Sequence, residues 1–288
     1  MRAGFAWAVM PAIPLAPTFR DQPHPNGLAH FMDLTFFADP ETMGLIRQLY
    51  WLCAPLYVAG IALPVTLGWI FFVHAGVASL CNSQGAIGHM TQAGSLVLLA
   101  QWLASLWRLG VSRGGLKEAL LGSRAAMNLA MDWSRQGLAA AYVVSALAKL
   151  HHSKGLWIWK TPLLELQVRK TNDMQYYNEL SLPPKIMGWL ADPLFDHPWL
   201  ARIVLGAALP LELFAFLLCF NRRMAALFGV ALWVFHSTVS ELMRLGFALN
   251  KQMLVIFCIN LPFWIYWFAA GRKSRTLTAA DAAPAHRP

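Results

Sequence analysis

Long apolar runs recur along this chain from residue 45 to residue 270, separated by short polar or basic stretches. The chain is 57% hydrophobic and only 13% charged, whereas about a quarter of the residues in a soluble domain are charged. Apolar runs of this kind are typical of helices that cross a lipid bilayer. The sequence therefore predicts an all-α fold, a polytopic integral membrane helical bundle with about six to seven transmembrane helices.

The apolar runs place the predicted helices along the chain. Their approximate ranges are 45–62, 65–80, 90–109, 133–149, 199–220, 224–239 and 253–270. Pro64 leaves two alternatives for the first pair, because a proline there fits either a tight hairpin or a kink. Residues 110–132 are basic and amphipathic, which predicts a helix at the membrane interface.

We divide the chain into three parts. Residues 1–44 form an N-terminal arm and loop, which carry only a weak signal-peptide pattern and which we expect to be irregular or interfacial. Residues 45–270 form one transmembrane domain, and residues 271–288 form a polar, disordered tail. Within the domain, residues 150–198 make the longest segment outside the membrane.

The basic residues predict the orientation of the chain. They gather in short loops at 108–124, 222–223 and 272–275, and lysine and arginine are retained on the cytoplasmic side of membrane proteins. These loops can all lie on that side if residues 150–198 are extracytoplasmic. The net charge of +9 is therefore a property of membrane loops, and we expect no nucleic-acid partner.

The four cysteines predict neither a disulfide framework nor a metal site. They stand at Cys53, Cys81, Cys219 and Cys258, and no two of them form a CxxC motif. Three lie inside apolar runs, where cysteine usually packs as a small hydrophobic residue.

Two ionisable residues inside the predicted helices are candidate catalytic groups. An ionisable residue near the centre of a membrane helix costs about 2.5–3.5 kcal/mol on insertion scales, so such residues are usually functional. Lys149 ends the fourth helix, after the small residues of VVSALA, and His236 lies in the middle of the sixth. A desolvated lysine can act as a base near neutral pH. The alternative for Lys149 is an ordinary polar helix end.

Other polar residues in these helices also leave alternatives open. Arg47 either reaches the interface with its long side chain or serves the site. Glu212 either supports the chemistry or pairs with a buried cation and holds helices together. His74 is expected to be a neutral packing residue, and His151 and His152 to be solvated loop residues or part of the site.

Four segments together resemble the membrane domain of the vitamin K-dependent γ-carboxylase, a member of the horizontally transferred transmembrane domain family. They share an Asp-Pro before an early arginine, a helix that ends near a lysine and is followed by a tryptophan, a helix with an embedded acid, and a helix that carries a histidine. The segments are DPETMGLIRQLYW, WSRQGLAAAYVVSALAKL with Trp157, LPLELFAFLLCFNRR, and WVFHSTVSELMRLGFALNKQMLVIFCINLP. The resemblance covers residues 39–270 and implies a bacterial inner (plasma) membrane protein.

The resemblance implies a role for each candidate residue. Lys149 would be the base that deprotonates a vitamin K-like quinol, the implied cofactor. His236 and His89 would bind or orient the quinol, and Arg47 and Glu212 would be supporting charges. The family's enzyme also carries a large lumenal portion that binds peptide, which this chain lacks, so we do not expect it to carboxylate protein glutamates.

Three functions follow from these observations. The first is a quinol- or lipid-linked oxidoreductase or carboxylase-like enzyme that uses Lys149 as a base, with a hydrophobic small molecule as its ligand. The second is a non-catalytic membrane subunit that assembles with a partner protein. The third is a transporter of a small hydrophobic molecule. The enzyme hypothesis requires Lys149 to face an enclosed cavity close to His236 or His89. The subunit hypothesis predicts instead that Lys149 is buried and paired, without a cavity.

Overall fold

The computed structural model is all-α over the residues that it describes, which are 1–12, 18–85, 89–111, 124–180, 192–194, 196–243 and 245–269. The α-helices are α1 (Arg2–Val9), α2 (Pro40–Ala59), α3 (Leu63–Asn82), α4 (His89–Val111), α6 (Arg124–Ser153), α7 (Trp157–Lys160), α8 (Leu164–Glu179), α10 (Pro198–Val204), α11 (Ala208–Leu213), α12 (Arg222–Met243) and α13 (Ala248–Met253). The 3₁₀-helix η5 (Phe214–Cys219) extends α11, and the π-helix η6 (Leu254–Ile259) extends α13.

Five helices in the described ranges are long and apolar enough to cross a bilayer. They are Leu63–Asn82, Thr91–Val111, Pro198–Cys219, Arg222–Met243 and Ala248–Ala269. These correspond to the second, third, fifth, sixth and seventh predicted helices, so the all-α fold and five candidate membrane spans are confirmed. The first and fourth predicted helices are also helical, as α2 and α6, with 20 and 30 residues.

The boundaries of α6 differ from the prediction. This helix begins at Arg124 rather than Trp133, so it includes residues 124–132 of the predicted interfacial helix. It also continues past Lys149 to Ser153. His151 and His152 therefore lie in the last turn of this helix rather than in a loop, and both side chains are exposed. Residues 112–123, 181–191 and the predicted tail at 271–288 lie outside the described ranges.

A tight hairpin joins α2 to α3, which decides between the two alternatives for Pro64. Gly60 and Ala62 both adopt left-handed backbone conformations, with φ of 80° and 49°. Glycine reaches this conformation without steric strain, so the chain reverses there. Pro64 then lies in the first turn of α3, where its missing N–H has no helical partner to lose.

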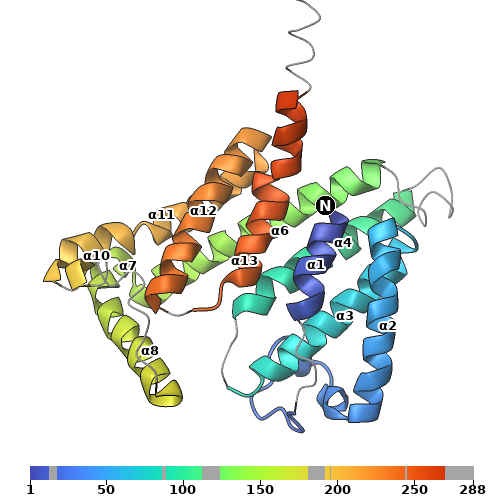
Figure 1. Ribbon diagram of the computed structural model, residues 1–288, viewed down its shortest axis with the longest axis horizontal. Coiled ribbons are helices and arrows are strands. Elements are labelled where there is room, and N and C mark those ends of the chain that lie inside the picture. Colours follow the sequence, from blue (N-terminus) through green and yellow to red (C-terminus); the bar gives the residue numbers. More distant parts are fainter. Residues whose placement is uncertain are drawn as a thin grey trace, which may run out of the picture.

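The long helix α6 crosses the molecule between two groups of helices (Figure 1). It contacts α4 on one side and α11 and η5 on the other. The helices α1 to α4 form the first group, and α7, α8, α10, α11 and α12 form the second (Figure 1). The helix α13 contacts both α4 and α12.

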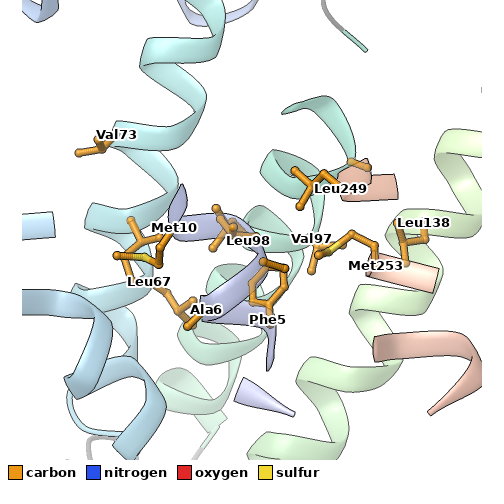
Figure 2. Packing of buried hydrophobic residues seen from close by; sticks show 14 of the residues in the cluster. Phe5, Ala6, Met10, Leu67, Val73, Val97, Leu98, Leu138, Leu249 and Met253 are labelled. Atoms are coloured by element: carbon orange, nitrogen blue, oxygen red, sulfur yellow. The ribbon is translucent and has the colours of Figure 1, made fainter. Parts of the chain in front are cut away.

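The N-terminal arm is a core element, which corrects the prediction of an irregular or interfacial segment. Phe5 of α1 is only 1% exposed, and its ring packs edge-on against the rings of Tyr57 and Phe257. Figure 2 shows α1 surrounded by apolar side chains of α3, α4 and α13, among them Leu98 and Met253. Burial of this apolar surface explains why so short a helix is stable there.

A second, smaller hydrophobic cluster is formed by residues of α8, α10 and α12 and of the segments next to them. It consists of Val168, Leu194, Ala201, Leu205, Val239, Leu242 and Met243. The C-terminal half of α12 contributes three of these residues. Both clusters contribute walls to the cavity described below.

Two of the predicted membrane helices are irregular. The fifth is divided into α10, α11 and η5, with Pro210 inside α11. The seventh passes through η6, where the wider π turn leaves the carbonyl of Phe257 to accept a hydrogen bond from Nε of Arg135 at 2.8 Å. This bond satisfies a backbone group that lipid could not.

Candidate functional site

A largely apolar cavity of about 590 Å³ lies among α4, α6, α11, α12 and the start of α13. Its size falls within the range of small-molecule sites, roughly 300–1,000 Å³. Most of its wall consists of apolar side chains, and both hydrophobic clusters contribute some of them. The apolar lining includes Leu96, Leu138, Leu164, Leu205, Phe235 and Val239. An apolar molecule of moderate size would therefore be favoured inside it.

Lys149 and Glu212 form an ion pair in the wall of this cavity. Nζ of Lys149 donates a hydrogen bond to Oε2 of Glu212, and the hydroxyl of Ser145 donates to the same oxygen at 3.2 Å. Glu212 is only 4% exposed, whereas the Lys149 side chain is 21% exposed. The structure thus identifies the cation that pairs with Glu212, and it brings that pair to a cavity.

The ring of Trp157 lies beside the ammonium group. Nζ of Lys149 is 5.5 Å from the centroid of that ring, a distance at which the ring's π face attracts a cation. Trp157 also lines the cavity. Glu212 and Trp157 therefore both hold the lysine side chain at the cavity wall.

His236 reaches the same cavity from α12 and is hydrogen-bonded to Tyr142 of α6. The Tyr142 hydroxyl and Nε2 of His236 are 2.9 Å apart. Either group can donate in this bond, because an imidazole nitrogen is a donor or an acceptor according to the tautomer. Asn250 of α13 also lines the cavity.

Three buried polar atoms of residues that line the cavity have no hydrogen-bond partner within the described residues. They are Nδ1 of His236, Oδ1 of Asn250, which is an acceptor, and Nε1 of Trp157, which is a donor. The ring of His236 also packs against that of Phe247, at 4.6 Å between centroids. Buried polar atoms usually have partners, so these atoms are suited to bind a ligand with both an acceptor and a donor.

The other predicted site residues are not shown to join this cavity. Arg47 lies on α2, which packs against α1 and α3 and contributes no residue to the cavity wall. Arg47 is therefore not among the residues that the structure brings to the cavity with Lys149. His89 begins α4, and its side chain lies outside the described part of the structure. His74 is buried and shares a hydrogen bond with Ser95 at 2.9 Å, as expected of a packing residue.

Three polar residues of the site were missed in the sequence. Tyr142 and Ser145 stand seven and four positions before Lys149, so the helical repeat puts all three on one face of α6. That spacing could have identified them. Asn250 carries no such signal, because it reaches the cavity only through the tertiary fold. Trp157 was named in the sequence only as part of the resemblance, without a role at the site.

A metal ion has no evident site in the ranges that the structure describes. No group of three or more His, Cys, Asp or Glu side chains is close enough there to hold one. The groups available for chemistry at the cavity are an amine, a carboxylate, an imidazole and a phenol, all of which can hold or transfer protons.

The chain was compared with protein-family models, with curated proteins and with solved structures, and nothing in any of the three comparisons matches it.

Proposed function

We propose that the cavity binds a lipid-soluble, quinol-like molecule and that Lys149 accepts a proton from its hydroxyl group. One observation carries this proposal: the Lys149–Glu212 pair and the Tyr142–His236 pair line the same largely apolar cavity. An apolar ring system partitions into such a space. The polar wall then meets the ring's oxygen atoms.

Proton exchange within the ion pair would prepare the base. When the proton moves from Nζ of Lys149 to Oε2 of Glu212, both groups become neutral and the amine has a free lone pair. Apolar surroundings favour this state, because they penalise buried charges. The amine can then accept a proton from a bound hydroxyl, and the resulting ammonium lies beside the anion it has created.

His236 and Asn250 would orient the ligand. In the tautomer that carries its proton on Nδ1, His236 can donate to one oxygen of the ligand, and Oδ1 of Asn250 can accept from a hydroxyl. When bound, a quinol would supply an acidic hydroxyl and, once deprotonated, a reductant. Donor, acceptor, base and apolar walls together fit a ring that carries two oxygen atoms.

The resemblance to the γ-carboxylase membrane domain supports the same lysine as the base. On that basis we propose a quinol- or lipid-linked oxidoreductase or carboxylase-like enzyme in the inner membrane of a bacterium. We further propose that α2 and α6 also cross the membrane, which gives seven spans. With 20 and 30 residues they are about 30 and 45 Å long, enough for a hydrocarbon core of about 30 Å.

Quinol consumption in proteoliposomes tests the proposed function. We expect the intact protein to oxidise an added quinol in air, and Lys149→Ala to abolish this activity while far-UV circular dichroism stays unchanged. Lys160→Ala removes an exposed lysine outside the cavity and should keep full activity. Equal rates of quinol consumption by Lys149→Ala and the unaltered protein, or no consumption of any quinol, would refute the proposed enzymatic activity.

A transporter of a small hydrophobic molecule is the second candidate, because the fifth helix is broken near Glu212. Discontinuous helices often form substrate sites in transporters, and α11, which carries Glu212, is only six residues long. Movement of a quinone analogue between leaflets without chemical change would favour this function. The non-catalytic subunit is supported less, because it requires the Lys149 pair without a cavity.

A further inference from the structure

A second pocket lies at the N-terminal end of α12, away from the cavity residues of that helix. Its volume is about 360 Å³. We name it the arginine–aromatic pocket, and its lining residues are Asn221, Arg222, Arg223, Phe263, Trp264 and Trp267. The proposed function makes no use of any of them.

The two arginines of this pocket carry charge that no carboxylate neutralises. Both are exposed, no acidic residue lines the pocket, and neither takes part in an ion pair among the described residues. Cζ of Arg222 lies 4.1 Å from the ring centroid of Phe263. Stacking of this kind fixes the guanidinium plane and leaves its N–H edges free to bind an anion.

The start of α12 adds to this positive potential. Oδ1 of Asn221 accepts hydrogen bonds from the backbone N–H groups of Arg223 at 3.0 Å and Met224 at 2.9 Å. This cap fixes the helix end beside the arginines, and a helix N-terminus carries a partial positive charge. Its contribution is secondary to the two full charges of the guanidinium groups.

The aromatic side of the pocket lies where two membrane helices end. The candidate spans Arg222–Met243 and Ala248–Ala269 meet there, start against end. Trp267 is 49% exposed, and its neighbours Tyr266 and Phe268 are exposed as well. Tryptophan and tyrosine gather at the level of lipid headgroups, because their rings are apolar at one end and polar at the other. The pocket therefore lies at the boundary between hydrocarbon and water.

We infer that the arginine–aromatic pocket binds the phosphate headgroup of an anionic phospholipid, with the acyl chains lying against the exposed aromatic side chains. A ligand of this pocket must carry negative charge, to match two unpaired guanidinium groups, and must remain at the membrane interface. An anionic phospholipid meets both conditions, and a free phosphate ion meets only the first. The inference does not depend on the proposed function of the cavity.

Native mass spectrometry of the full chain in detergent, with equal amounts of phosphatidylglycerol and phosphatidylcholine, tests this inference. We expect the unaltered protein to retain phosphatidylglycerol in preference. Arg222→Gln/Arg223→Gln should reduce that retention by about fivefold for each arginine. Trp267→Leu, which keeps both charges, should also reduce it, and Arg223→Gln alone serves if the double variant fails to fold.

A charge-matched control separates the pocket from net charge. Lys160→Gln/Lys170→Gln removes two exposed cations from α7 and α8 and should leave retention unchanged. Three results would overturn the inference: no preference for the anionic lipid, an equal loss in the lysine control, or full displacement of the lipid by inorganic phosphate. The last result would mean that the pocket is only an ion site.

Discussion

Lys149 of α6 and Glu212 of α11 stand 63 positions apart in the chain and form an ion pair inside the helical bundle. The carboxylate is almost fully buried and also accepts a hydrogen bond from Ser145. A buried charge is tolerated only when it is paired and hydrogen-bonded. The pair therefore determines how α6 and α11 can pack, and it also places an amine at the wall of a cavity.

Glu212→Gln should lower the stability of the protein. The substitution leaves the Lys149 ammonium without its counter-charge, and breaking a buried pair costs about 3–5 kcal/mol. Because Lys149 is 21% exposed, we expect a loss at the lower end, about 3 kcal/mol. Chemical unfolding in detergent micelles measures it. An unchanged unfolding curve would show that the pair does not stabilise the fold.

The double variant Lys149→Met/Glu212→Leu separates the loss of a pair from the burial of an unpaired charge. Apolar residues of similar size often replace a buried ion pair with little effect on stability. The double variant should therefore be more stable than Glu212→Gln alone, although it should have no quinol-dependent activity. Additive losses from the two positions would contradict this coupling.

Tyr142→Phe should also destabilise the protein. The change removes the hydroxyl that shares a hydrogen bond with Nε2 of His236, and it leaves that buried nitrogen without a partner. An unsatisfied group of this kind typically costs about 1–3 kcal/mol. Tyr266→Phe, at a residue that is 73% exposed, is the matched control and should be neutral. The same unfolding measurement applies, and equal stability of the two variants would refute the buried hydrogen bond.

Gly229→Ala should disturb the contact between α12 and η6. A Cβ atom at Gly229 would lie 2.8 Å from Cβ of Cys258, closer than two carbon atoms pack. Overpacking of this kind typically costs about 1–3 kcal/mol. Gly44→Ala on α2 is the control, because nothing lies within 4 Å of the added atom, and alanine there should stabilise the helix by about 0.5–1 kcal/mol. Melting temperatures that fall for both variants would argue against this interpretation.

Helix positions could be predicted from the sequence, because apolar length is imposed by the bilayer and is visible locally. The start of α2 is also local, since Asp39 accepts a hydrogen bond from the backbone N–H of Thr42 as an N-cap. The start of α6 was not predicted: residues 124–132 were expected to be helical, but as part of a separate interfacial helix, because their basic and amphipathic pattern differs from the apolar run that follows. The burial of Phe5 was missed for another reason: a short helix is stabilised by packing against α13 and α2, which sequence does not show.

The candidate site was predictable only in part. Lys149 and His236 stood out because ionisable groups are rare in apolar helices, and the cavity lies beside both. The pairing of Lys149 with Glu212 and the partnership of His236 with Tyr142 depend on contacts between distant helices. Arg47 shows the limit of the same reasoning, since a charge in an apolar helix need not belong to the same site.

Mass spectrometry of the small molecules that co-purify with the protein tests most directly the claim that this cavity holds a lipid-soluble ring compound. The unaltered protein should carry a quinone or quinol. Ala141→Trp, which fills the cavity from α6, should lose it, and Ala140→Trp, at the exposed neighbouring position, should keep it. Absence of any such compound from the unaltered protein, or equal amounts in both tryptophan variants, would contradict the claim.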